Sequence, residues 1–253
     1  MAVDGVVLEV QGVSKSFGAL AALDGVSLAV RAGDVYSVIG PNGAGKSTLF
    51  NVIAGLYLPT AGRVVFRGEE ITGLTPEAIN RRGLAKTFQI TNIFPEISVL
   101  ENVRVACQSR AGVSGRLSSL WRSPDVERPV MELLEAFGLG GRRDDLAENL
   151  SHGEQRYLEI CLALATEPTL LLLDEPTAGM TPGETKEATA LIRRIAQARG
   201  LTVLLIEHDM SVVMGISDRV AVLHFGEKIA EGTPDQIRSD PRVIEAYLGG
   251  ADD

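Results

Sequence analysis

Residues 40–48 read Gly40-Pro41-Asn42-Gly43-Ala44-Gly45-Lys46-Ser47-Thr48 and fit the phosphate-loop pattern G-x-x-x-x-G-K-[ST]. The apolar, β-branched residues 34–39 before the loop predict a buried strand. Residues 49–55 after it have a helical pattern that ends at a glycine. In this setting the loop N–H groups and the helix dipole bind phosphate, and a glycine-rich turn without a ligand is the weaker alternative.

The residue types in the loop assign roles to its side chains. Lys46 is expected to contact the β- and γ-phosphates, and Ser47 is expected to ligate Mg²⁺. The loop therefore predicts a nucleotide site, but it does not say what the nucleotide is used for.

Length and composition limit the classes of protein to consider. The 253 residues suit one large domain or a domain with a subdomain, and 45% hydrophobic residues suffice for a sizeable core. A net charge of −9 makes the chain a poor general binder of nucleic acid or of anionic membranes. Cys107 and Cys161 stand among apolar neighbours and are predicted to pack in the core, and no Cys/His cluster suggests a metal site.

The sequence contains no membrane-spanning signal. No apolar run approaches the roughly 20 residues that cross a bilayer. The first residues lack the charged and apolar regions of a signal peptide. We expect a soluble cytoplasmic protein, which can still be a peripheral subunit if a partner supplies the membrane spans.

The remaining pattern predicts a β-rich layer, a helical stretch and an alternating α/β region. Strands are expected at 6–10, 26–30, 62–66 and 84–88, helices at 99–106 and 130–137, and a surface loop or short helical insert at 109–124. Then follow a strand at 169–173, a helix at 183–198, a strand at 201–206, a helix at 209–215 and a strand at 218–223. Such alternation implies an α/β fold with a mainly parallel sheet, here interrupted by a helical subdomain near residues 90–160.

A second apolar run, Leu170 to Leu173, ends in Asp174 and Glu175. Ligands of parallel sheets bind at the carboxyl ends of strands, so both carboxylates are expected near the phosphate loop. Asp174 could hold Mg²⁺, directly or through water, and Glu175 could then orient or deprotonate an attacking water. Two surface acids at a strand end are the alternative.

The segment Leu150-Ser151-His152-Gly153-Glu154 opens another helix. Ser151 is a good N-cap, and Glu154 completes a capping box, which by itself accounts for the pattern. The functional alternative is a second anion site at this helix start, offered to a partner's nucleotide.

Taken together, these motifs resemble the nucleotide-binding subunits of ATP-binding cassette (ABC) transporters. The phosphate loop, Gln89, the segment 150–154, the run 170–175 and His208 occur in that family's order over nearly the whole chain. The resemblance implies a single ABC ATPase domain over residues 1–253, with a P-loop core, an antiparallel β-subdomain and an α-helical subdomain.

The resemblance also implies a dimer that sandwiches two ATP molecules. Residues 40–48 would bind the phosphates of one ATP, and Ser151 and Gly153 of the other subunit would contact its γ-phosphate. Phe17 matches the aromatic residue that stacks on adenine, with a core strand residue as the alternative. Gln89 matches a residue that contacts Mg²⁺ and the attacking water, with an exposed polar loop residue as the alternative. His208 matches a γ-phosphate contact, with a structural histidine as the alternative.

Two positions depart from the family pattern. His152 replaces the commonest glycine of the 150–154 element, and the aspartate that many relatives have near Met180–Thr181 is absent. Binding is expected to survive the first change, whereas the second leaves communication between the two sites open.

Residues 83–89, 177–182 and 243–249 resemble the branched-chain amino-acid importer branch, whose relatives also serve urea, amides and aromatic acids. The insert at 109–124 fits one of that branch's two paired ATPases. This implies a peripheral ATPase on the cytoplasmic face of the inner or plasma membrane, bound to integral permease subunits and to a second ATPase that is identical or different. An exporter ATPase, for example for lipopolysaccharide, and a soluble non-transport ABC ATPase stay open.

The permease is expected to dock after Gln89, where Ile93-Phe94-Pro95-Glu96-Ile97 places apolar residues in a loop. A loop folded onto its own subdomain is the alternative.

Overall fold

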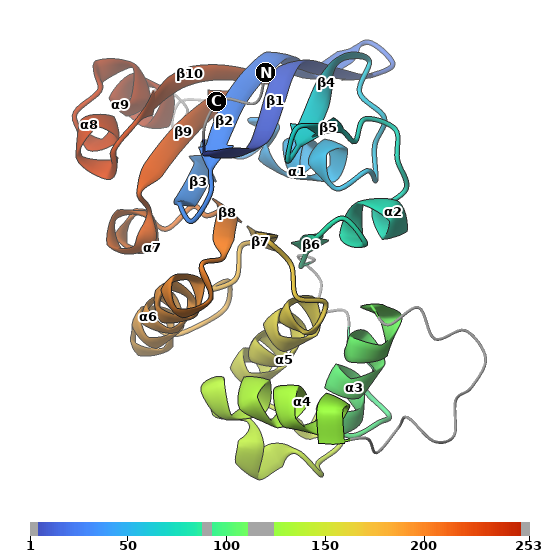
Figure 1. Cartoon of the computed structure of the whole chain (residues 1–253). Helices are drawn as coiled ribbons and strands as arrows, with labels where there is room; N and C mark the ends of the chain where they lie inside the picture. Colours follow the sequence, from blue (N-terminus) through green and yellow to red (C-terminus); the bar gives the residue numbers. More distant parts are fainter. Residues whose placement is uncertain (1–4, 88–92, 111–123, 249–253) are drawn as a thin grey trace.

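The computed structural model describes residues 5–87, 93–110 and 124–248. In this part of the chain two sheets and several helices form the layers seen in Figure 1. Gln89, most of the predicted insert at 109–124 and the residues 249–253 lie outside the described residues.

The first sheet is antiparallel, in the order β2-β1-β4-β5. Its strands are β1 (Val6–Phe17), β2 (Leu20–Arg31), β4 (Ala61–Phe66) and β5 (Glu69–Glu70). The predicted strands 6–10 and 26–30 were too short, because β1 and β2 continue through register shifts. One shift lies between Val10 and Val13, where Gly12 has a φ of 58° and lets the strand bulge without ending.

The second sheet has the order β10-β9-β3-β8-β7-β6. Its strands are β3 (Val35–Ile39), β6 (Leu84–Lys86), β7 (Leu170–Asp174), β8 (Thr202–Ile206), β9 (Arg219–His224) and β10 (Glu227–Gly232). All neighbours pair in parallel except β9 and β10. The mainly parallel α/β sheet predicted from the sequence is confirmed.

Helices pack on both faces of the second sheet and beyond its β6–β7 side. They are α1 (Lys46–Ile53), α2 (Pro76–Asn80), α3 (Val99–Arg110), α4 (Pro124–Ala136), α5 (His152–Ala165), α6 (Pro182–Arg199), α7 (Met210–Ile216), α8 (Pro234–Arg238) and α9 (Pro241–Leu248). The predicted helix 130–137 begins earlier, at Pro124, and α3 reaches Arg110, so both ends of the loop predicted at 109–124 are helical. Strand β10 and helices α2, α8 and α9 were not predicted.

Alternate residues of the central strands pack into different hydrophobic cores. Leu204 and Ile206 of β8 pack with α1 and the antiparallel sheet, whereas Val203 and Leu205 pack with α5 and α6. Full burial on both faces explains the continuous apolar runs of β7 and β8. Cys161 is fully buried in the second of these cores and Cys107 packs partly buried against it, as predicted.

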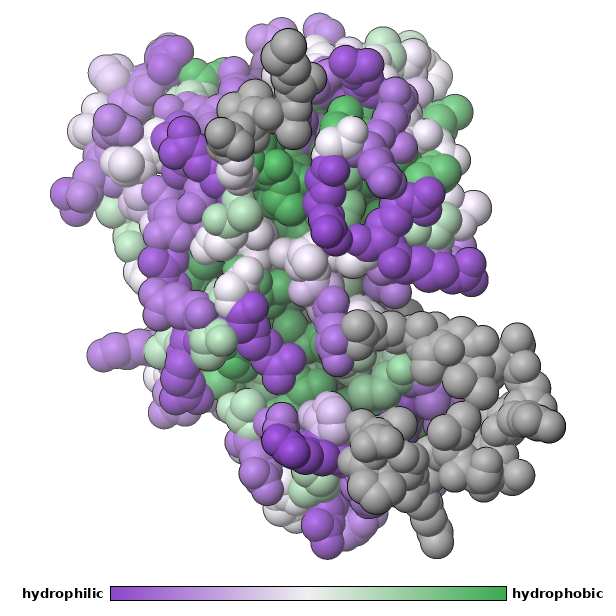
Figure 2. Space-filling model, viewed as in Figure 1, coloured by the Kyte–Doolittle hydropathy of each residue, from purple (hydrophilic) through white to green (hydrophobic). Residues whose placement is uncertain are grey.

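Helices α3, α4 and α5 lie together beyond the β6–β7 side of the sheet (Figure 1). Polar residues cover much of the surface in the same view, and hydrophobic residues show mainly in its middle (Figure 2). Among the described residues, no helix combines the length and apolar character needed to cross a membrane.

Candidate nucleotide-binding site

The phosphate loop joins the end of β3 to the start of α1, as the sequence predicts. Gly45 precedes the first helical residue, and its carbonyl accepts the Leu49 N–H at 2.9 Å. Gly40 lies so close to β9 that a Cβ atom there would be 2.1 Å from the Leu223 carbonyl oxygen. Glycine is required at position 40 because backbone occupies the space of a side chain.

A cavity of about 460 Å³ lies over this loop. Its lining combines the loop with the ends of β1 and β2, the end of β7 and the β9–β10 turn; these residues are Phe17, Leu20, Ala21, Ala22, Asn42, Gly43, Ala44, Gly45, Lys46, Ser47, Thr48, Glu175 and Phe225. Segments far apart in sequence thus converge on the predicted phosphate cradle.

The Lys46 side chain folds back onto its own loop. Its Nζ atom donates to the carbonyl oxygens of Gly40 at 2.8 Å and Pro41 at 2.9 Å. Burial lowers the pKa of Lys46, while the charges of Glu175 and Asp174 act in the opposite direction. These two bonds hold the ammonium in place before a ligand arrives, and a phosphate that contacts Lys46 would replace them.

Asp174 and Glu175 at the end of β7 have different surroundings. Asp174 is 3% exposed, and its Oδ1 atom has no hydrogen-bond partner among the described residues. Burial raises the pKa of Asp174, and the Lys86 charge opposes that effect. Glu175 lines the cavity with a φ of 49°, a sparsely populated conformation for a non-glycine residue that is common at functional sites.

His208 follows β8 and faces Glu175. Its Nδ1 atom lies 3.8 Å from Glu175 Oε1, and its side chain is largely exposed. The neighbouring Glu207 is fully buried; its Oε1 atom accepts the Thr177 hydroxyl at 2.6 Å, and its Oε2 atom accepts the His208 N–H at 3.2 Å. Glu207 therefore ties the segment after Glu175 to the backbone of His208.

Phe17 stands at the end of β1 with its ring 44% exposed, so it is not a core residue. The ring of Tyr57 meets it edge-on with centroids 5.4 Å apart, and Lys15 Nζ lies 5.0 Å from the Phe17 centroid. The ring is supported from one side and faces the cavity on another, which suits stacking on a base.

The oxygen donors at the site fit Mg²⁺. Mg²⁺ prefers oxygen ligands and keeps several waters. Ser47 is exposed in the first turn of α1, and the buried Asp174 Oδ1 lacks a partner within the described part of the chain. Gln89, the remaining predicted ligand, lies outside the described residues.

Ser151 and Gly153 lie at the start of α5, away from this cavity. The predicted capping box is present: Ser151 Oγ accepts the Glu154 N–H at 3.3 Å, and Glu154 Oε2 accepts the Ser151 N–H at 2.8 Å. The His152 ring lies beside the segment after Glu175, since a Cβ atom on Gly179 would be 3.3 Å from His152 Cδ2. The bulk of His152 is thus accommodated against a glycine.

Sequence reasoning missed Lys86, Glu207 and Phe225. Phe225 lines the cavity with an 81% exposed ring and a φ of 46°. The pair Phe225-Gly226 is a turn signal from which the position of Phe225 could have been predicted. Nothing in the local sequence indicates that Lys86 approaches Asp174 or that Glu207 binds Thr177, because each contact joins segments that are far apart in the sequence.

Comparison with known proteins agrees with this geometry. The family model described as "ABC transporter" matches residues 23–178. The chain belongs to the ABC transporter family. A second model, "Branched-chain amino acid ATP-binding cassette transporter", matches residues 227–253. As an ABC ATPase of the transport-subunit type, the chain is an ATP-hydrolysing enzyme.

Curated relatives of this ABC ATPase cover almost its whole length. It is 44% identical over 252 residues to the "High-affinity branched-chain amino acid transport ATP-binding protein LivG" of Escherichia coli (strain K12), covering 97% of this chain and 98% of the relative. It is 45% identical over 252 residues to the corresponding protein BraF of Pseudomonas aeruginosa, with the same coverage.

Solved structures support the fold. An ATP-binding cassette of an ABC transporter in its ADP conformation superposes with a TM-score of 0.83 at 35% identity, covering 96% of this chain and 99% of the other. A dimeric ATP-binding cassette in a post-hydrolysis state with ADP and Pi gives 0.77 at 26% identity, covering 90% and 98%. Similar cassettes therefore bind nucleotide, and at least one is dimeric.

Proposed function

We propose that this ABC ATPase powers an importer for branched-chain amino acids or closely related amides. The observation that carries the proposal is the 44% identity to LivG over 97% of the chain, joined to a C-terminal match to the branched-chain amino-acid transporter model. The cavity over the phosphate loop supplies the place where ATP would bind.

In this proposal ATP lies with adenine against Phe17 and its phosphates over residues 40–48. Phosphoryl transfer depends mainly on positioning and on stabilising negative charge. Lys46 and His208 would contact the γ-phosphate, and Glu175 would accept a proton from the attacking water. Mg²⁺, held by Ser47 and Asp174 and aided by Gln89, would neutralise charge on the phosphates.

Ser151 and Gly153 are not among the described residues that line the cavity over their own phosphate loop. Ser151 and Gly153 stand exposed or partly exposed at the N-terminus of α5, where helix N–H groups favour an anion. We assign them to the nucleotide of a second ATPase subunit, identical or different. ATP would then close the pair and hydrolysis would open it, because the bridging contacts need the γ-phosphate.

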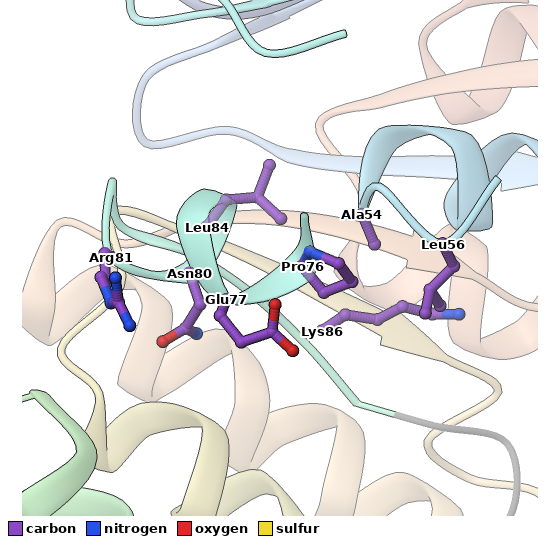
Figure 3. Close-up of a pocket in the computed structure, with 8 residues that line it drawn as sticks. All are labelled: Ala54, Leu56, Pro76, Glu77, Asn80, Arg81, Leu84 and Lys86. Atoms are coloured by element: carbon purple, nitrogen blue, oxygen red, sulfur yellow. The ribbon is translucent and has the colours of Figure 1, made fainter. Parts of the chain in front are cut away.

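A groove of about 350 Å³ on another face suits the permease. It lies between the end of α1, helix α2 and strand β6, and both apolar and polar side chains line it; the lining residues are Ala54, Leu56, Pro76, Glu77, Asn80, Arg81, Leu84 and Lys86 (Figure 3). Such a mixture of apolar and polar groups is typical of protein interfaces. An integral permease subunit would insert a short cytoplasmic segment here and hold the chain at the membrane.

Phe94 offers a second contact for the permease. Its ring is 53% exposed, while its backbone is fixed by the fully buried Asn102, which donates to Phe94 O at 2.9 Å and accepts from Phe94 N at 2.8 Å. Ile93 instead packs against the core, so only part of the predicted 93–97 loop is exposed to a partner.

Reconstitution tests the function. The chain would be co-expressed with integral permease subunits of a branched-chain amino-acid transporter, and the complex placed in vesicles with a solute-binding protein that binds leucine. We expect ATP-dependent leucine uptake. Uptake of urea or an amide alone would correct the solute, whereas ATP-driven efflux or a failure to copurify with any integral subunit would overturn the importer assignment.

A further inference from the structure

Lys86 connects the docking groove to the metal-binding end of the nucleotide site. It is the last residue of β6, and its side chain is 8% exposed. Its stem lines the groove, and Figure 3 shows the side chain extended with its ammonium toward α1. A charged group is rarely buried to this degree without strong partners.

The ammonium meets groups from two other elements. Lys86 Nζ donates to Asn51 Oδ1 of α1 at 2.6 Å and lies 3.7 Å from Asp174 Oδ2 of β7. Asp174 Oδ1 is buried and has no hydrogen-bond partner in the described part of the chain. One carboxylate oxygen thus faces the lysine, and the other is a buried acceptor that a ligand could satisfy.

Asn51 extends this link along the helix that follows the phosphate loop. Its side chain holds Lys86, while its carbonyl oxygen accepts the N–H groups of Leu56 at 2.8 Å and Tyr57 at 3.1 Å. Leu56 lines the groove beside Lys86. Contacts in the groove therefore reach both Asn51 and the Lys86 ammonium.

We propose that Lys86 is a positioning residue that acts as the counter-ion of Asp174 until Mg²⁺ takes over that role, and that this exchange links metal-nucleotide binding to the state of the groove. The proposal rests on the proposed nucleotide function. Mg²⁺ at Asp174 would repel the ammonium in a poorly solvated region. The shift moves the Lys86 stem in the groove, and by linkage a partner that draws Lys86 away from Asp174 favours Mg²⁺.

The sign of the effect follows from charge. Without the lysine charge, the negative charge of Asp174 is not compensated before Mg²⁺ binds. The repulsion between the ammonium and bound Mg²⁺ is also removed. Both changes favour Mg²⁺. Lys86→Met keeps most of the stem and removes the charge, Lys86→Gln is neutral but keeps hydrogen-bonding groups in case the first variant does not fold, and Lys86→Arg keeps the charge.

The first measurement is calorimetric titration with the non-hydrolysable analogue AMP-PNP, in Mg²⁺ and in EDTA. The dissociation constant in EDTA divided by the dissociation constant in Mg²⁺ gives the contribution of the metal. We expect this ratio to rise by about fivefold to tenfold in Lys86→Met and Lys86→Gln. It should stay near the wild-type value in Lys86→Arg and in the control Lys186→Met, whose lysine is exposed on α6.

The second measurement reports on the groove. A polarity-sensitive fluorophore is placed on Arg81→Cys in a Cys107→Ser background, since Cys161 is fully buried. Mg²⁺ with AMP-PNP should change its emission relative to AMP-PNP in EDTA, and this change should be lost in Lys86→Met and kept in Lys86→Arg.

An unchanged or smaller ratio in both neutral variants, or the same emission change in Lys86→Met as in the parent, would overturn the exchange. If the wild-type chain binds no AMP-PNP at all, the proposed nucleotide function fails instead.

Discussion

The Nδ1 atom of His208 lies 3.8 Å from the Oε1 atom of Glu175, across the ends of the neighbouring strands β7 and β8. This separation exceeds a hydrogen bond, so neither group is fixed by the other. A water that contacts both groups could donate to the Glu175 carboxylate and meet the imidazole of His208. This arrangement is compatible with the proposed roles of Glu175 toward a water and of His208 toward the γ-phosphate.

Replacing Glu175 by Gln should abolish turnover without abolishing binding. The amide keeps the shape of the side chain but cannot accept the proton of an attacking water, and loss of a general base costs about 100-fold or more in rate. The rate of phosphate release should fall by that factor while the affinity for ATP is retained. In the presence of ATP, the variant should accumulate as a dimer in size-exclusion chromatography. Glu187→Gln on the exposed face of α6 is the matched control. Near-normal hydrolysis in Glu175→Gln would remove Glu175 from the mechanism.

Thr177→Val tests the buried tie between the segment after Glu175 and His208. The change keeps the side-chain shape and deletes the hydroxyl that donates to Glu207 at 2.6 Å. A buried carboxylate that loses a partner costs roughly 1–3 kcal/mol in the free energy of unfolding. We expect a lower melting temperature by calorimetry and a lower kcat with little change in ATP affinity.

The control for this change is Thr189→Val, because the Thr189 hydroxyl donates only to a carbonyl of its own helix, that of Thr185. It should alter the unfolding free energy by less than about 0.5 kcal/mol. Equal effects of the two substitutions would show that Glu207 does not depend on Thr177.

Phe94→Ala should uncouple transport from hydrolysis. The ring is exposed and the loop backbone is held by Asn102, so the unfolding free energy should change by less than about 0.5 kcal/mol. ATPase activity of the isolated chain should stay at its wild-type level, while uptake by the reconstituted complex falls. Ile244→Ala, another exposed apolar residue, on α9, should leave uptake intact. Wild-type uptake in Phe94→Ala would exclude this contact.

The pair Arg193–Asp218 gives a pH dependence with a defined sign. Burial raises the pKa of Asp218, but hydrogen bonds from Arg193 and from the Val35 N–H outweigh it, and the net pKa lies below the ordinary value of 3.8. A carboxylate with a lowered folded pKa stabilises the fold above its unfolded pKa and loses that contribution as the pH falls through the folded value.

Asp218→Asn should therefore lower the melting temperature at pH 7 by about 2–4 °C, which corresponds to roughly 1 kcal/mol in a chain of this size. The difference from wild type should shrink below pH 3.8, the ordinary pKa of the group. A difference that is constant from pH 7 to pH 3 would mean that the charge of Asp218 does not contribute.

The sequence predicted the order and type of the central elements well because their signals are local. The predicted strands at 169–173, 201–206 and 218–223 agree with β7, β8 and β9 to within a residue at each end, since full burial makes them apolar throughout. Strand β10 was missed because Glu227 and Lys228 give it no apolar run, although Thr233 and Gln236 form a recognisable capping box for the helix after it.

The phosphate loop and Glu175 could be predicted to share one site, because the carboxyl ends of parallel strands meet at one edge of a sheet. Phe17 ends a strand of the other sheet, and only the family resemblance assigned it to this site. The partners that hold this site could not be predicted. The Lys86–Asp174 and Thr177–Glu207 contacts depend on which strands are neighbours and on their register, which no local pattern encodes.

The close approach of Gly40 to the Leu223 carbonyl also has a genetic consequence. Every missense change at codon 40 adds at least a Cβ atom, which would lie 2.1 Å from a backbone oxygen that cannot rotate away. A mutational scan should find this codon intolerant of every substitution, alanine included. Variants with altered nucleotide preference should therefore be sought at Phe17 and Leu20, which line the same cavity with side chains that can be exchanged.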